Sequence, residues 1–150
     1  MLGDSSNNSL QMDSFPMDLG ENQNLDYCRV ATIDIGTNST HLLIAKLEHK
    51  LNTFSIEIAE KSTTRLGERD PDTGDLTTLA MNRAFETLKR FKDLAESYKV
   101  ANILITATSA VREAPNGNAF IKEVKDKLDF NVDLVSGFEE ARLIYLGVLS

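Results

Sequence analysis

Small polar residues follow an apolar run in the segment Ile33–Ser39, which reads Ile-Asp-Ile-Gly-Thr-Asn-Ser. Gly36 has no side chain, so the backbone can approach an anion closely at this point. Successive backbone N–H groups of such a turn can bind phosphate oxygens, and Thr37, Asn38 and Ser39 add side-chain donors. The pattern predicts a phosphate-binding turn between two strands, although Gly and Asn are also common in ordinary hairpin turns.

An acidic residue, Asp34, lies two positions before Gly36. Its carboxylate can bind a divalent cation, or a water molecule beside a phosphate, because hard cations prefer oxygen ligands. The rest of the sequence lacks the Cys and His spacing that is typical of a metal centre. We therefore predict Asp34 as the metal ligand of the turn.

A second group of polar residues begins at Thr108, after the apolar run 102–107. The guanidinium of Arg112 can bind two phosphate oxygens at once, and Thr108 and Ser109 offer hydroxyl or backbone donors. Two alternatives stay open. Arg112 can instead pair with Glu113, and the two hydroxyl residues can serve as simple turn residues.

A third group lies at Ser136–Arg142. Ser136 and Glu139 have the spacing of a capping box, in which the serine caps a helix and the glutamate reaches back to it. Glu140 is left without a structural role. A carboxylate in the first turn of a helix stays ionised, and it can orient and deprotonate a water made acidic by a metal or by the reacting phosphorus. The alternative is a second solvated acid.

In this order, the three groups resemble the exopolyphosphatase / guanosine pentaphosphate phosphatase (Ppx/GppA) family of the actin-like ATPase superfamily. The glycine turn is widespread in that superfamily, whereas the block Glu139–Arg142 is specific to the phosphatases. The resemblance covers about residues 29–150. It implies that Glu140 is the catalytic base and that the loop with Arg112 contacts phosphate. It also implies Mg²⁺ as cofactor, and it places Arg65 beside the substrate path.

The resemblance further implies a substrate, either inorganic polyphosphate, whose terminal phosphoanhydride is hydrolysed, or guanosine pentaphosphate. This part of the chain does not separate the two. A non-catalytic module that binds phosphate or a guanosine alarmone is the alternative, and the Glu139–Arg142 block argues against a sugar kinase. Family members carry a later Asp-x-Gly-Gly-Gly-Ser motif that opens a second half-domain, and this sequence stops at Ser150 before it. We therefore expect the N-terminal part of a longer enzyme, inactive alone. A homodimer of the full-length protein stays open.

Composition limits the classes of partner and compartment. The chain has 150 residues, 41% of them hydrophobic, one cysteine and no apolar run of the ~20 residues that a membrane helix needs. The net charge of −7 is concentrated in residues 1–28, which hold five acids and no lysine or arginine, so the remainder is nearly neutral. We expect a cytoplasmic protein without a membrane or nucleic-acid partner.

Hydrophobic periodicity predicts the elements that position these residues. Residues 1–28 form a disordered acidic arm, and 29–150 form one α/β half-domain of ribonuclease H-like fold, a mixed five-stranded sheet with flanking helices. The carboxyl ends of such strands share one rim, so Asp34, Thr108 and Ser136 should converge. His41 is interpreted as a packed or edge residue. The predicted strands are 29–35, 41–48, 53–62, 102–107 and 131–135, and the predicted helices are 78–98, 117–128 and 137–148.

Overall fold

A single mixed sheet organises the computed structural model, which describes residues 26–137 and 139. Its strand order is β3-β2-β1-β4-β5. β2 is antiparallel to β1 and β3, whereas β4 is parallel to β1 and β5 is parallel to β4. This is the mixed five-stranded, ribonuclease H-like sheet that the sequence predicts. The strands are β1 (Tyr27–Ile35), β2 (Ser39–Glu48), β3 (Thr53–Thr63), β4 (Asn102–Ala107) and β5 (Val132–Leu134).

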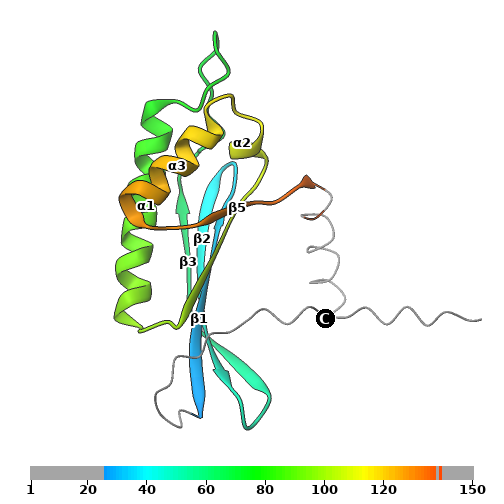
Figure 1. Ribbon diagram of the computed structural model, residues 1–150, viewed down its shortest axis with the longest axis vertical. Helices are drawn as coiled ribbons and strands as arrows, with labels where there is room; N and C mark the ends of the chain where they lie inside the picture. Colours follow the sequence, from blue (N-terminus) through cyan, green and yellow to red (C-terminus); the bar gives the residue numbers. More distant parts are fainter. Residues whose placement is uncertain (1–25, 138, 140–150) are drawn as a thin grey trace, which may run out of the picture.

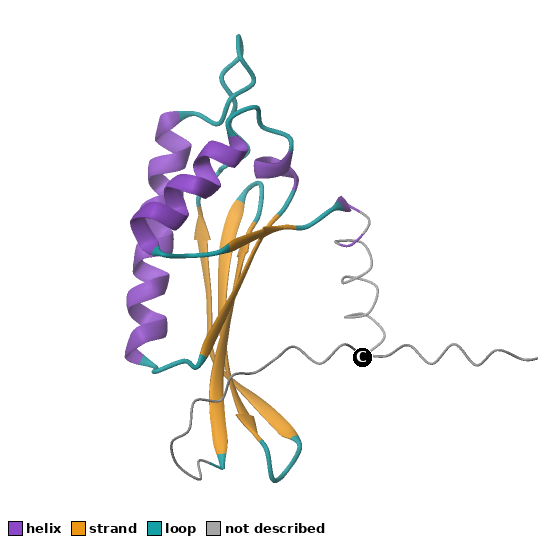
Figure 2. Ribbon diagram, viewed as in Figure 1, coloured by secondary structure: helices purple, strands orange, loops and turns teal. Residues whose placement is uncertain are grey.

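Two helices lie together on one face of the sheet: α1 (Thr78–Ser97) and α3 (Gly117–Leu128) (Figures 1 and 2). α1 begins after Thr77, whose hydroxyl accepts a hydrogen bond from the N–H of Ala80 at 3.2 Å, as an N-cap should. Both helices bury apolar side chains at three- and four-residue steps against the sheet. A shorter helix, α2 (Ser109–Arg112), forms a single turn between β4 and α3.

The two faces of the sheet differ because side chains alternate along each strand. Toward α1 and α3 the sheet is apolar and buried, with Ile33, Ile35, Leu42, Ile44 and Ile105 in the core. We call the opposite side the open face. It carries the exposed apolar side chains of β3 and β4, with Phe54 at 65%, Ile56 at 55% and Leu104 at 47%.

The structure differs from the predicted elements mainly at their ends. β1 begins at Tyr27 and β2 at Ser39, each two residues earlier than predicted, and β5 is shorter. α2 was not predicted as a helix, because a single turn has no hydrophobic period to detect. Residues 1–25 of the predicted arm lie outside the described residues. The same holds for the predicted third helix except Gly137 and Glu139, which are helical.

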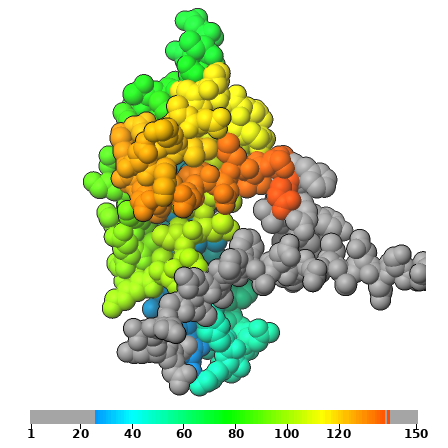
Figure 3. Space-filling model, viewed as in Figure 1, coloured from blue at the N-terminus to red at the C-terminus, as the bar shows by residue number. Residues whose placement is uncertain are grey.

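The segment 65–77, between β3 and α1, projects as a narrow tip at one end of the molecule (Figure 3). The carboxylate of Asp70 accepts the N–H groups of Asp72 and Thr73 at 2.9 and 3.0 Å, which closes the tip. The side chain of Asn116 binds both the N–H and the carbonyl of Leu76, at 2.8 and 3.1 Å. These bonds fix the base of the tip against the start of α3. No helix in the described part is both long and apolar enough to cross a membrane.

Candidate phosphate-binding site

The turn between β1 and β2 is tight. The N–H of Gly36 donates to the carbonyl of Ser39 at 3.1 Å. A Cβ atom at position 36 would lie 2.8 Å from that same carbonyl oxygen, closer than real Cβ atoms come. A glycine is therefore required here by close approach of the backbone, as the sequence pattern predicted.

The 65–77 segment holds the turn from the side. The N–H of Arg65 donates to the carbonyl of Asn38 at 2.9 Å, and the N–H of Gly67 donates to the carbonyl of Thr37 at 2.8 Å. Within the described residues, the N–H groups of Thr37 and Asn38 donate to no acceptor. The carbonyls of Thr37, Asn38 and Ser39 thus accept hydrogen bonds, while the N–H groups of Thr37 and Asn38 are available to a ligand. An anion-binding turn needs such available N–H groups.

A second wall comes from the segment after β4. The hydroxyls of Thr37 and Ser109 lie 3.3 Å apart, and the N–H of Thr108 donates to the carbonyl of Ile35 at 3.3 Å. β1 and β4 are parallel neighbours, so the segments that follow them leave the sheet at the same edge. The structure therefore brings the first two polar groups of the sequence together.

Asp34 lies at this edge with an exposed side chain, and its carboxylate accepts a hydrogen bond from the hydroxyl of Thr106 at 3.3 Å. No group of three or more His, Cys, Asp or Glu side chains gathers in the part of the chain that the structure describes. The donor set at the turn is one carboxylate with hydroxyl oxygens. Such a set fits Mg²⁺, which keeps several waters and is commonly bound by one or two carboxylates plus substrate phosphates.

Arg112 connects the second polar group to the third. Its guanidinium donates to the carbonyl of Val135, and it lies 3.4 Å from the carboxylate of Glu113. The pairing with Glu113, which the sequence left open as the alternative to phosphate binding, is therefore present beside a contact with the residue after β5. Since a Cβ atom at Gly137 would lie 3.8 Å from this guanidinium, Arg112 sits directly beside the start of the helix after β5.

The capping interaction predicted at Ser136 is present. The serine hydroxyl accepts the N–H of Glu139 at 3.1 Å. Since β5 is parallel to β4, Ser136 after β5 leaves the sheet at the same edge as Thr108 after β4. Glu140, the predicted catalytic base, lies outside the described residues, so its role stays a prediction.

His41 is a residue that sequence reasoning left out of the site. Its Nε2 lies 3.1 Å from the hydroxyl of Ser39, and it is the cross-strand partner of both Asp34 and Lys61. All of these side chains share the open face. The alternation with the buried Leu42 and Ile44 already puts His41 on the face opposite the core, but only the register shows that it lies beside Asp34.

Arg69 is a second residue that the sequence did not indicate. Its guanidinium donates to the carbonyl of Ala110 in α2. Its other terminal nitrogen is buried and has no hydrogen-bond partner among the described residues. The contact joins the 65–77 segment to α2, so this segment holds both walls of the candidate site.

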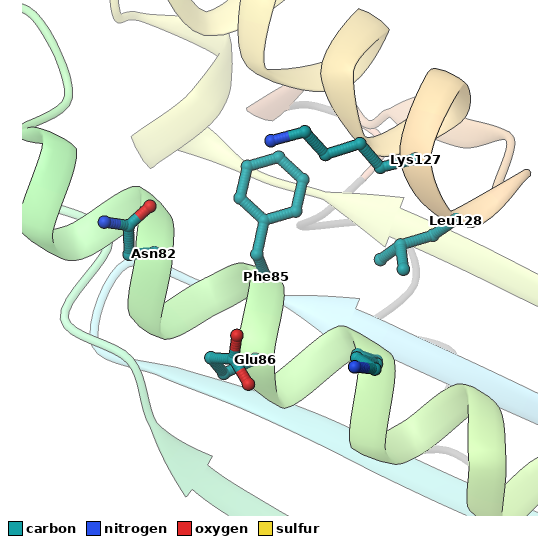
Figure 4. Close-up of a pocket in the computed structure, with 6 residues that line it drawn as sticks. Asn82, Phe85, Glu86, Lys127 and Leu128 are labelled. Carbon is teal, nitrogen blue, oxygen red and sulfur yellow. The ribbon is translucent and has the colours of Figure 1, made fainter.

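A separate groove of about 350 Å³ lies between α1 and α3 (Figure 4). The Lys127 ammonium lies 5.0 Å from the centre of the Phe85 ring there. None of its lining residues belongs to the candidate site. They are Asn82, Phe85, Glu86, Lys89, Lys127 and Leu128.

The strand order and the turn between β1 and β2 define a ribonuclease H-like half-domain. The family model of the Ppx/GppA phosphatase family matches residues 43–150. The chain belongs to the Ppx/GppA phosphatase family, as the resemblance in its sequence predicted.

Individual relatives agree with this membership. The chain is 37% identical over 125 residues to the bifunctional 3-dehydroquinate synthase/phosphatase of Fusobacterium nucleatum, a match covering 80% of the chain and 19% of that protein. It is 32% identical to the guanosine-5'-triphosphate,3'-diphosphate pyrophosphatase of Aliivibrio fischeri, covering 79% of the chain and 23% of that protein.

A solved structure shows the shared fold. The exopolyphosphatase of Cytophaga hutchinsonii superposes with a TM-score of 0.75 at 36% identity, covering 80% of this chain and 38% of that structure. The chain thus spans between about a fifth and two fifths of the length of these proteins.

Proposed function

We propose that this chain is the N-terminal part of an exopolyphosphatase that hydrolyses the terminal phosphoanhydride of inorganic polyphosphate. The observation that carries the proposal is the turn at Gly36, whose carbonyls are bonded to the 65–77 segment while the N–H groups of Thr37 and Asn38 stay available. Family membership and the similarity to a solved exopolyphosphatase support the reaction class.

In this proposal, several residues of the chain bind the terminal phosphate. The turn from Gly36 to Ser39 binds the terminal phosphate through backbone and hydroxyl donors, and Ser109 adds a hydroxyl from the second wall. The guanidinium of Arg112 lies beside Gly137, 3.8 Å from where a Cβ would be, and offsets phosphate charge there. It is already bonded to Val135, so a ligand would share this guanidinium with that carbonyl.

Glu140 follows Ser136 by four positions in the sequence. We assign it the role of the base that orients and deprotonates the attacking water. Asp34 would hold Mg²⁺, and the metal when bound would neutralise charge on the phosphate oxygens. The leaving group is the shortened polyphosphate, and the product is orthophosphate.

Guanosine pentaphosphate is the second candidate substrate. The similarity to the pyrophosphatase of Aliivibrio fischeri favours it, and the phosphoanhydride chemistry is the same. In this proposal the turn and Arg112 bind the phosphate that is hydrolysed, and other residues recognise the rest of either substrate. In this proposal a homodimer of the full-length protein also remains an option for completing the site.

The test is release of phosphate by a protein that continues this chain through the second half-domain of the family. It would be supplied with Mg²⁺ and, separately, with polyphosphate or guanosine pentaphosphate. Release from polyphosphate that exceeds release from guanosine pentaphosphate supports the proposal. The reverse preference would favour the second candidate, and no release from either would refute both.

A further inference from the structure

The guanidinium of Arg69 is only partly used by the fold. One of its terminal nitrogens donates to the carbonyl of Ala110, while the other, Nη1, is buried and has no hydrogen-bond partner among the described residues. A buried donor of a charged group costs free energy when it is left unpaired. An apolar side chain of similar length would avoid this cost, so stability alone does not account for an arginine at this position.

The carbonyl of Ala110 needs a donor from outside α2. Its partner in a continuing helix would be the N–H of Ala114, but that N–H donates instead to the carbonyl of Val111, at 3.4 Å. Among the described residues, Arg69 is the donor to the Ala110 carbonyl. A cation is also favourable at the carbonyl end of a helix. Arg69 therefore stabilises the end of a helix that is only one turn long.

The backbone of Arg69 is held in place at the base of the tip. Arg69 pairs with Leu76 in an isolated antiparallel bridge. Leu76 is in turn bonded through both of its backbone groups to the side chain of Asn116, at the start of α3. The guanidinium thus extends toward α2 from a segment that is itself fixed by hydrogen bonds.

Arg69 completes a closed ring of contacts beside the turn. Two residues before it, the N–H of Gly67 donates to the carbonyl of Thr37 at 2.8 Å. One residue before Ala110, the hydroxyl of Ser109 lies 3.3 Å from that of Thr37. The turn and α2 are therefore joined directly by the two hydroxyls, and a second time through the 65–77 segment and Arg69.

We propose that Arg69 is a positioning residue of the candidate site, which holds α2 against the turn so that Ser109 and Arg112 meet a bound phosphate. The inference rests on the proposed function and deepens it. Arg69 acts here through α2 and makes no contact with the phosphate itself.

The other connections of α2 do not replace this one. The N–H of Thr108 donates to the carbonyl of Ile35 on β1 at 3.3 Å, and the carbonyl of Val111 lies close to Gly117 of α3. These contacts hold the two ends of the helix to the sheet and to α3. The contact of Arg69 instead comes from the segment that also bonds the turn, so it sets the position of α2 relative to the turn.

The proposal predicts a reciprocal effect of phosphate. If the contact of Arg69 with α2 favours phosphate binding, phosphate binding must favour the contact by the same free energy. Orthophosphate should therefore slow amide hydrogen exchange in residues 111–114 of the unmodified protein. This slowing should be lost when the guanidinium is removed.

The test compares the 150-residue protein with Arg69→Met, which keeps a side chain of similar length and removes the guanidinium. Amide exchange is followed by NMR in residues 111–114 and in α1, with and without orthophosphate. Orthophosphate affinity is measured by calorimetry at fixed Mg²⁺ and ionic strength. Arg69→Lys keeps one donor for Ala110. Arg90→Met is the matched control, because it also removes one charge and one hydrogen bond, to Glu60, but joins α1 to β3.

We expect Arg69→Met to speed exchange in residues 111–114 but not in α1, and to lower orthophosphate affinity about fivefold, the effect of one neutral hydrogen bond. Arg69→Lys and Arg90→Met should stay within about twofold of the unmodified protein. Ser109→Ala should also lose about fivefold. The double variant Arg69→Met with Ser109→Ala should lose clearly less than the product of the two, because both changes act on the same donor.

Several results would overturn the positioning role. Unchanged exchange in residues 111–114 of Arg69→Met would do so, and so would an Arg69→Met protein that does not fold, since Arg69 would then serve stability. Losses that multiply in the double variant would mean that Arg69 acts on phosphate by its own charge.

Failure of the proposed function has a different signature. In that case Gly36→Ala, which disturbs the turn, would leave orthophosphate affinity unchanged. If Gly36→Ala lowers the affinity while Arg69→Met does not, only the positioning role is wrong. An unmodified protein that binds no orthophosphate overturns both.

Discussion

The side-chain hydroxyl of Thr37 lies 3.3 Å from that of Ser109, across 72 positions of sequence. The contact is exposed and joins the turn after β1 to the helix after β4. Either hydroxyl can be the donor, so one O–H of the pair can turn to a ligand while the other hydroxyl keeps the contact. The two walls of the candidate site are thus joined before any phosphate binds.

The close approach at Gly36 predicts a selective loss of phosphate binding. In Gly36→Ala the new Cβ would lie 2.8 Å from the carbonyl of Ser39, so the turn must open. We expect orthophosphate affinity to fall at least about tenfold, with a stability cost of about 1–3 kcal/mol. Calorimetric titration and urea unfolding measure the two effects. Gly137→Ala, whose Cβ makes only an ordinary 3.8 Å contact, should change neither; an equal loss there would show that the effect is not specific to the turn.

A larger stability effect is expected where α2 meets α3. A Cβ at Gly117 would lie 1.9 Å from the carbonyl oxygen and 3.0 Å from the carbonyl carbon of Val111, and these backbone atoms cannot rotate away as a flexible side chain would. Gly117→Ala should therefore destabilise the protein by about 3 kcal/mol or more. The urea midpoint measures this, with the exposed neighbour Asn118→Ala as control. A midpoint within experimental error of the unmodified protein would mean that the junction relaxes freely.

Much of the fold was predictable because its elements have clear hydrophobic periods. The alternation of Phe54, Ile56 and Ile58 with polar residues predicted β3. The first predicted helix contains the buried side chains from Ala84 to Ala95. The start of β2 was predicted two residues too late because Ser39 and Thr40 read as part of the polar turn, although Thr40 is buried and its hydroxyl contacts that of Thr64 at 3.1 Å.

The candidate site was only partly predictable, for a physical reason. Local sequence patterns indicate Gly36 and Ser136, whereas the placement of His41 between Asp34 and Lys61 depends on cross-strand register. The register of β2 and β3 shifts at a bulge between Ile44 and Ala45, which no sequence signal near these residues marks. The contact of Arg69 with Ala110 could likewise not be predicted, because the two residues are 41 positions apart in the sequence.

An ion pair at the far end of the sheet predicts acid sensitivity. Arg29 donates two hydrogen bonds to Glu57, at 2.5 and 3.1 Å, and holds the pKa of Glu57 below its ordinary value of 4.5. A carboxyl with a lowered pKa in the folded state contributes stability above its unfolded pKa, and this contribution is lost as pH falls through the folded pKa.

Glu57→Gln should therefore lower Tm at pH 7, and the difference from the unmodified protein should shrink as pH falls below about 4.5. Thermal unfolding followed by circular dichroism between pH 7 and pH 3 measures it. Glu86→Gln, at an exposed position of α1 without an ion pair among the described residues, is the control for the substitution itself. A Glu57→Gln difference that stays constant into acid would contradict the ion-pair explanation.

The two neighbouring glutamates Glu139 and Glu140 should behave differently when each is replaced by glutamine. The N–H of Glu139 is bonded to Ser136, and a glutamine can still serve a capping box, so Glu139→Gln should cost mainly some stability. In a protein that continues through the second half-domain, Glu140→Gln should keep substrate binding and lose turnover by about 10²–10⁴-fold, since it removes the base. Phosphate release and calorimetric titration separate the two effects. An inactive Glu139→Gln beside a fully active Glu140→Gln would reverse the assignment.

The 150-residue chain alone should bind phosphate weakly and release none from polyphosphate. The donors of the turn and of α2 approach the phosphate from one edge of one sheet, and the chain spans 38% of the exopolyphosphatase that it superposes on. Phosphoryl transfer depends on positioning and on charge stabilisation around the whole reacting group, and a one-sided site does not exclude water. Phosphate release with Mg²⁺ would be compared between the chain and its Glu140→Gln variant, at equal concentration. Release clearly above that of the variant would show that one half-domain suffices, and a rate that rises with the square of protein concentration would indicate that two copies complete the site.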